Sequence, residues 1–244
     1  MSTIVPAVLP KNRTELAAAL ARFASVPEIR HVQIDIVDGR FAAPPTWPYA
    51  VTEGRNECSA MISACEHIPE AGRFRFDIDL MTLAPEEVVG EWIALGASRL
   101  TVHVESTLNI AALIHTLKEE YGYSKGMPDL LMLGLALNID TDTMVLEPFI
   151  NDINYVQFMG IKTIGKQGEP FDPRVLEKIT AFRKRHPDIS VQVDGGVTLE
   201  TAPALLDAGV SRLVLGHALR DAEDIAAAYR AFSELTTKHG VHHA

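Results

Sequence analysis

Three short acidic motifs stand at the ends of apolar, strand-like stretches of this 244-residue chain. They are Asp35-Ile36-Val37-Asp38-Gly39, Asp77-Ile78-Asp79-Leu80-Met81 and Val193-Asp194-Gly195-Gly196. Residues two apart in a strand share a face, so each motif carries one carboxylate on the polar face at its strand end: Asp35, Asp79 and Asp194. Carboxylates from three separate strand ends predict one converging active site.

Three such carboxylates need charge compensation if they share one cavity. Two unit charges ~4 Å apart repel by roughly 4 kcal/mol at an effective dielectric constant of 20. A bound cation, one or two retained protons, or a lysine folded over the site would each supply compensation, and Lys162 and Lys166 are the loop candidates. Strands buried on both faces are usually apolar throughout, whereas these alternate, so we expect their polar face to line a wet space.

The elements that must position these residues follow a regular order. Strands are predicted at residues 4–9, 31–37, 74–80, 99–104, 131–138, 155–159, 190–193 and 212–215. Helices are predicted at residues 13–25, 51–65, 85–95, 109–120, 143–150, 173–185, 199–208 and 221–238. This α/β alternation with right-handed crossovers predicts a single (β/α)8 TIM barrel over residues 1–238, followed by a frayed tail at 239–244. A doubly wound open sheet is the alternative, but no Gly-x-Gly-x-x-Gly turn follows the first strand.

Composition excludes several classes of partner. The formal net charge of −10 argues against a nucleic-acid or anionic-membrane surface, so an anionic ligand needs a local site. The longest strongly apolar stretch, residues 130–137, is too short to cross a bilayer. Cys58 and Cys65 predict buried thiols in a reducing compartment rather than a disulfide, and nothing at the amino terminus resembles a secretory signal. We therefore expect a cytoplasmic protein.

The predicted barrel gives further residues a place. Active sites of such barrels lie at the carboxyl ends of the strands, and the loops after the last two strands commonly hold a phosphate. The polar or flexible residues expected at those ends are His103, Glu105, Asn138, Met159, Gly195, Gly196, Gly216 and His217. The glycines let backbone N–H groups approach an anion closely, so the expected ligand is a small phosphorylated molecule.

Taken in order, the motifs resemble those of the ribulose-phosphate 3-epimerase family and the wider ribulose-phosphate-binding barrel superfamily. The matching segments are Ile4-Val5-Pro6-Ala7-Val8-Leu9, Asp35-x-x-Asp38-Gly39-x-Phe41, Asp77-x-Asp79-Leu80-Met81, Val102-His103-Val104-Glu105, Ala136-Leu137-Asn138-x-x-Thr141, Val156-x-x-Met159, Val193-Asp194-Gly195-Gly196 and Gly216-x-Ala218. The resemblance implies a homo-oligomeric isomerase that inverts C3 of a ketopentose 5-phosphate through an enediolate. It assigns Asp35 and Asp194 as the two acid/base groups.

The same resemblance brings out departures at the metal site. The family carries His-x-Asp on the second strand, a histidine before Leu-Met on the third and an aspartate on the seventh. Here Gln33 and Asp79 replace the two histidines. The predicted ligands Asp35, Asp79, Asp194 and the Gln33 carbonyl form an all-oxygen set, which favours Mg²⁺ or Mn²⁺ over Zn²⁺. A metal-free acid/base pair stays open as an alternative.

Several of these residues also have plain structural interpretations. Asp38 before Gly39 is expected to be a turn residue, and Asp77 is expected to pair with Arg75 one layer deeper in the barrel. Asp79 could ligate a metal or simply accept a hydrogen bond, and His103 could be a satisfied core histidine. His217 is expected to neighbour the phosphate.

Two other functions remain open at this stage. The first is another sugar-phosphate isomerase, aldolase or decarboxylase of the same superfamily. A decarboxylase of that kind typically carries a lysine near the aspartates, and neither motif here contains one. The second is a catalytically silent barrel that binds a sugar phosphate.

Overall fold

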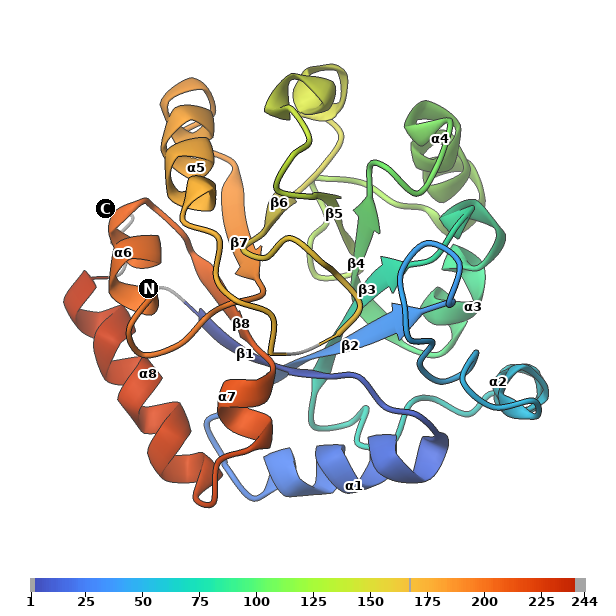
Figure 1. Ribbon diagram of the computed structural model, residues 1–244. Coiled ribbons are helices and arrows are strands. Elements are labelled where there is room, and N and C mark those ends of the chain that lie inside the picture. Colours follow the sequence, from blue (N-terminus) through green and yellow to red (C-terminus); the bar gives the residue numbers. More distant parts are fainter. Residues whose placement is uncertain (1–2, 167, 240–244) are drawn as a thin grey trace.

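The computed structural model describes residues 3–166 and 168–239 and forms a closed barrel of eight parallel strands. The strands run in sequence order around the barrel, and β1 pairs with β8 to close it (Figure 1). They are β1 (Thr3–Val8), β2 (His31–Val37), β3 (Arg75–Met81), β4 (Ala97–His103), β5 (Met132–Leu137), β6 (Tyr155–Met159), β7 (Ser190–Asp194) and β8 (Arg212–Leu215). The predicted fold class is confirmed.

The helices surround the barrel (Figure 1). They are α1 (Arg13–Ala24), α2 (Gly54–Ser63), η1 (Pro85–Glu87), α3 (Val89–Ala94), α4 (Ile110–Tyr121), η2 (Thr143–Phe149), α5 (Arg174–Arg185), α6 (Ala202–Asp207), α7 (His217–Arg220) and α8 (Ile225–His239). Residues 85–95 were expected to form one helix, but Val88 leaves helical geometry at φ −125° and divides the segment into η1 and α3. The 3-10 segment η2 contains Pro148, which cannot donate an α-helical hydrogen bond.

The apolar core lies between the strands and the helices. The outward-facing residues Val32, Ile34 and Ile36 of β2 are fully buried there. On α5, Val175, Ile179 and Phe182 form the buried stripe expected from a 3.6-residue period. This layer holds each strand with its alternate residues turned toward the barrel axis, which is what positions the site.

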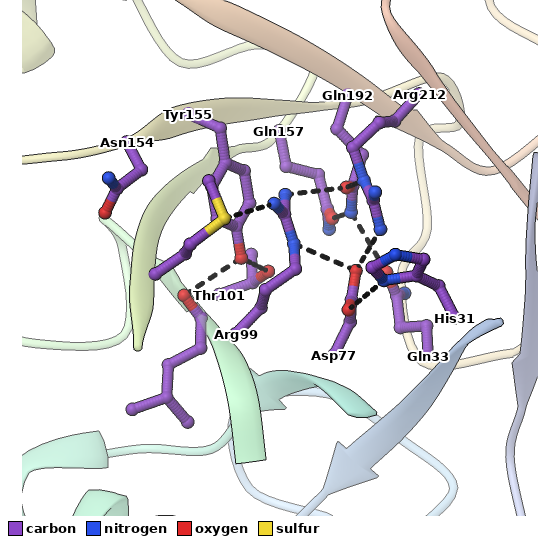
Figure 2. Close-up of polar contacts among 12 residues, drawn as sticks. His31, Gln33, Asp77, Arg99, Thr101, Asn154, Tyr155, Gln157, Gln192 and Arg212 are labelled. Carbon is purple, nitrogen blue, oxygen red and sulfur yellow. Dashed lines mark hydrogen bonds and ion pairs between the residues drawn. The ribbon is translucent and has the colours of Figure 1, made fainter. Parts of the chain in front are cut away.

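The barrel interior is polar and largely buried, so the predicted wet space is limited to the carboxyl ends of the strands, where Asp35 and Asp194 line a cavity. Gln33, Asp77, Thr101, Gln157 and Gln192 are all fully buried in it. The glutamines hydrogen-bond to one another, Asp77 pairs with Arg99 and Arg212, and Thr101 bonds Tyr155, as drawn in Figure 2. The alternation in sequence therefore reflects a buried polar network.

One predicted pairing within that interior is wrong. Asp77 does lie one layer deeper, but its partners are Arg99 at 3.0 Å and Arg212 at 2.5 Å, from β4 and β8. Arg75 is at the open amino-terminal end of β3, exposed, and lies 3.8 Å from Asp129. The two residues share a face of the strand, yet the adjacent strand β4 and the more distant strand β8 bring Arg99 and Arg212 closer to Asp77.

Three smaller predictions concern the cysteines, the end of the last helix and membrane-spanning segments. Cys58 and Cys65 are both free, but only Cys58 is buried. Helix α8 extends through His239, the first residue of the expected tail, and residues 240–244 lie outside the described part of the chain. Within the described residues, no helix combines the length and the apolar character needed to cross a bilayer.

Candidate active site

Three aspartates converge at the carboxyl ends of β2, β3 and β7. One carboxylate oxygen from each of Asp35, Asp79 and Asp194 lies within 4.8 Å of the others. Asp35 and Asp79 are register partners on the adjacent strands β2 and β3, while Asp194 lies on β7, next to its register partner Met159 of β6. The predicted convergence of strand-end carboxylates is therefore what the structure contains.

Local hydrogen bonds hold the end of β2 in place. The Thr46 hydroxyl donates to the Asp35 carbonyl at 2.8 Å and accepts from the Val37 N–H at 2.9 Å. Asp38 turns away from the site, and its Oδ1 accepts from the backbone N–H groups of Arg40 and Phe41. Asp38 is thus the turn residue that its position before Gly39 indicates.

Burial and mutual repulsion change how the aspartates ionise. Burial, followed by the negative charges of Asp194 and Asp79, raises the pKa of Asp35 well above its ordinary value. Burial, followed by the charge of Asp79, raises the pKa of Asp194 to about 7. At neutral pH the site therefore retains at least part of a proton, which is one of the forms of charge compensation anticipated from the sequence.

His103 of β4 supplies a second form of compensation. Its Nε2 lies 3.3 Å from Asp79 Oδ1, and its Nδ1 lies 3.9 Å from Glu105 Oε2. Burial lowers the pKa of His103, but the charge of Asp79, the hydrogen bond to it and the charges of Glu105 and Asp194 together raise it above its ordinary value. His103 is fully buried and packs against the Phe41 ring, at 5.4 Å between ring centroids.

Gln33 lies beneath the carboxylates of Asp35 and Asp194, on the side of the barrel interior. Its Nε2 donates to Asp35 Oδ1 at 2.8 Å and to Asp194 Oδ2 at 2.6 Å. Its Oε1 points the other way and accepts from Gln192 at 3.0 Å (Figure 2). The expected role of the Gln33 carbonyl as a metal ligand is therefore not supported, because the amide presents hydrogens, not oxygen, to the carboxylates.

A cavity opens above the carboxylates. Its walls include eight of the residues predicted from the sequence: Asp35, Met159, Lys166, Asp194, Gly195, Gly196, Gly216 and His217. The turn after β7 requires glycine, since Gly195 and Gly196 have φ of +91° and +68°. A Cβ on Gly196 would lie 2.8 Å from the Phe171 backbone, so even alanine would disturb the loop that covers this wall.

The other predicted residues lie outside this cavity wall. Lys162 is exposed on the far side of the loop after β6, beside Gly39 and Arg40. Within the wall itself, Lys166 is paired at 2.9 Å with Glu169, which lines the same cavity. Asn138 follows β5, where its N–H donates to Glu105 and its carbonyl accepts from Lys178.

A layer of buried glutamines supports the site and was not predicted from the sequence. Gln157 donates to Asp79 Oδ2 at 2.8 Å. Figure 2 shows how Gln192 connects Gln157 and Gln33 to Arg99 and Arg212. The period-two rule contained the signal, because Gln157 and Gln192 stand two residues before Met159 and Asp194. A polar residue two positions before a site residue in the same strand therefore indicates the supporting layer.

Comparisons with known proteins agree with one another. The sequence profile described as the ribulose-phosphate 3 epimerase family matches residues 3–220. Ribulose-phosphate 3-epimerase of Schizosaccharomyces pombe is 32% identical over 193 residues, covering 79% of this chain and 75% of that protein. The enzyme of the same name from Bacillus subtilis is 28% identical over 198 residues, covering 79% and 81%. Among solved structures, KGPDC from Streptococcus mutans has a TM-score of 0.64 at 17% identity, with 98% of this chain and 99% of that chain covered, which shows the fold alone.

Proposed function

The chain belongs to the ribulose-phosphate 3-epimerase family, and from this premise we propose that Asp35 and Asp194 interconvert D-ribulose 5-phosphate and D-xylulose 5-phosphate by acid/base proton transfer. One observation carries the proposal. The two carboxylates face one cavity, are joined from below by a single Gln33 amide, and both have raised pKa values. A pair that shares a proton at neutral pH is what a two-base epimerisation needs.

The proposed step moves one proton off C3 and another onto its opposite face. The ionised carboxylate takes the C3 proton, and the C–H electron pair forms the C2–C3 double bond of an enediolate as negative charge passes to the C2 oxygen. The protonated carboxyl on the other side then delivers its proton to C3, and the C2 carbonyl re-forms. The carboxyl groups end with exchanged protonation states, and C3 ends with inverted configuration.

The site also fits a divalent cation. Asp35, Asp79 and Asp194 offer three oxygens within 4.8 Å of one another, and the buried Asp79 Oδ1 has only the long 3.3 Å contact with His103 Nε2. We propose these three as the ligands, and the hard oxygen set favours Mg²⁺ or Mn²⁺ over Zn²⁺. When bound, such a cation would stabilise the negative charge that develops on the substrate oxygens. The metal-free pair is the alternative.

The substrate phosphate is proposed to bind at the loops after β7 and β8. The left-handed Gly195 and Gly196 expose backbone there, and Gly216 and His217 face the same cavity. These N–H groups, with the Lys166 ammonium, supply the local positive potential that an acidic protein otherwise lacks. His103 and Asn138 support this site through Asp79 and Glu105 and do not line the cavity wall.

A coupled assay of xylulose 5-phosphate formation tests the proposed function. Asp35→Asn and Asp194→Asn should each lower kcat by about a thousandfold or more, since general acid–base transfer contributes roughly 10² to 10⁴ in rate. Asp140→Asn is the matched control, because that carboxylate is exposed in the loop after β5 and pairs only with Arg174 among the ion pairs found. Wild-type protein without C3 inversion, or an Asp35→Asn variant within tenfold of it, would reject the proposal.

We further propose that the protein is a cytoplasmic homo-oligomer. Support for association comes from large apolar side chains left exposed on the described surface, including Leu108 and Leu130. Light scattering of the purified protein measures the mass directly, and a monomer at micromolar concentration would reject this part.

A further inference from the structure

Three glutamines form a chain of amides along the barrel axis beneath the carboxylates. Gln33 of β2, Gln157 of β6 and Gln192 of β7 are each fully buried. They lie between a lower layer of Arg99, Arg212 and Asp77 and the three aspartates above. We call Gln33, Gln157 and Gln192 the amide chain; Figure 2 shows them converging with the two arginines.

The arginines decide the orientation of Gln192. A guanidinium is a hydrogen-bond donor only, so the side chain that meets it must present oxygen. Gln192 Oε1 accepts from Arg99 Nη2 at 3.3 Å and from Arg212 Nε at 3.0 Å. The Gln192 NH₂ group must therefore point away from the arginines.

This orientation passes to the other two amides. Gln192 Nε2 donates to Gln33 Oε1 at 3.0 Å and to Gln157 Oε1 at 2.6 Å. The NH₂ groups of both partners are thereby turned upward, Gln33 to Asp35 and Asp194 and Gln157 to Asp79. Carboxylates accept and guanidinium groups donate, so both ends of the chain require the same polarity. Turning one amide would bring two oxygens or two NH₂ groups face to face.

We propose that Gln192 is a positioning residue for the acid/base pair, and that Gln33 is a hydrogen-bond donor to that pair rather than a metal ligand. The inference rests on the proposed roles of Asp35 and Asp194. One oxygen of each carboxylate is engaged from below by the same NH₂ group, so the other oxygen of each is the one that exchanges a proton with the substrate. The lower layer, with two guanidinium groups against the one Asp77 carboxylate, also directs a net positive charge toward the aspartates.

Gln192→Glu tests the direction of the hydrogen bonds in the amide chain, because glutamate has almost the same shape as glutamine. A glutamate still accepts from both arginines, but its second oxygen faces the carbonyls of Gln33 and Gln157, which lie 3.0 and 2.6 Å from Gln192 Nε2. Lone-pair repulsion then turns both amides over, and their oxygens face the aspartates. We expect kcat to fall roughly ten- to a hundredfold with KM within about threefold of wild type, since the change misorients the reacting carboxylates and leaves the phosphate loops intact.

Side-chain NMR gives a readout that a general loss of stability would not move. In protein labelled with ¹⁵N at glutamine side chains, the Gln33 NH₂ signal is assigned from a Gln33→Met variant. In wild type it should be slow to exchange with solvent and shifted downfield by its two carboxylate acceptors, and in Gln192→Glu it should shift back. Tyr155→Phe is the control, because it removes a buried hydroxyl bonded to Thr101 and the Leu100 carbonyl in the same interior without touching the amide chain.

The outcomes separate this inference from the proposed function. Active wild type with a Gln192→Glu variant that keeps kcat within threefold overturns the inference, and so does a lower kcat with an unmoved Gln33 signal. If Gln192→Glu does not fold, Gln192→Met removes the same acceptor and both donors; kcat must then fall, and the Gln33 NH₂ signal must exchange faster with solvent, because Gln33 Oε1 is no longer held by Gln192. An inactive wild type rejects the proposed function instead, and a rapidly exchanging Gln33 NH₂ signal in it would reject the amide orientation as well.

Discussion

Replacing Asp77 by asparagine should strongly destabilise the barrel. Asp77 is fully buried and lies 3.0 Å from Arg99 and 2.5 Å from Arg212. Burial raises its pKa, but the two guanidinium groups outweigh burial and lower the pKa to about 2. Asp77→Asn would leave two nearly buried guanidinium groups without a counter-charge, and breaking such a pair lowers the free energy of unfolding by about 3–5 kcal/mol.

The pH dependence of this loss follows from the direction of the pKa shift. The folded-state pKa of Asp77 lies below its unfolded value of about 3.9, so its stabilising effect is complete above that value and is lost as pH falls toward 2. The difference in unfolding free energy between wild type and Asp77→Asn should therefore be constant above about pH 5 and begin to shrink below about pH 4.

Urea denaturation at several pH values measures the effect. Glu91→Gln is the matched carboxylate-to-amide control, because Glu91 holds Arg55 in a two-pronged contact at the surface and should contribute about 1 kcal/mol or less. A loss below about 1 kcal/mol for Asp77→Asn, or one that stays constant down to the acid limit of folding, would refute the assignment of a buried, ionised Asp77.

Three further predictions concern the site. First, in protein stripped of divalent cations, kcat should fall as pH rises through an apparent pKa near 7, because the carboxyl pair then loses the proton that it must donate; a flat profile to pH 9 for that form would contradict the raised pKa of Asp194. Second, Gly196→Ala should raise KM about tenfold or more with kcat less affected, because its Cβ meets the Phe171 backbone and its φ is +68°, and an unchanged KM would place the phosphate elsewhere. Third, calorimetry should detect one Mn²⁺ or Mg²⁺ per chain, and Asp79→Asn should abolish this binding. Gln33→His should raise the affinity for Zn²⁺, because it adds an imidazole ligand. Stoichiometric zinc in the wild-type protein, or full activity in EDTA, would reject the hard-cation proposal.

The sequence was sufficient for the fold because two independent patterns agree. Apolar, strand-like stretches at 31–37, 155–159 and 212–215 end at the residues where the strands end, and amphipathic helices separate them. Element boundaries were less accurate where the backbone departs from regular geometry, as at Val88. The convergence of Asp35, Asp79 and Asp194 could be predicted because parallel strands of a barrel all end at one face.

The direction of the hydrogen bonds inside the barrel could not be predicted from one sequence. Alternation shows that Gln33 and Asp77 face inward, but their partners come from strands far away in sequence, such as Arg99, Gln192 and Arg212. Whether an amide presents oxygen or nitrogen depends on those partners, and this is why Gln33 was expected to be an oxygen ligand. Arg75 was assigned to Asp77 for the same reason. The two residues are close in sequence, whereas the contacts of Asp77 across the barrel could not be predicted.

Deuterium incorporation at C3 tests the central claim most directly. D-Ribulose 5-phosphate is incubated with the wild-type enzyme in D₂O, and product and remaining substrate are analysed by NMR at low conversion. Two opposed groups, Asp35 and Asp194, predict that each D-xylulose 5-phosphate formed carries one deuterium at C3 while the unreacted substrate keeps its proton. Product that retains the substrate's own C3 proton would contradict a two-carboxylate mechanism, and no inversion or exchange with the purified enzyme would contradict the assignment of this site.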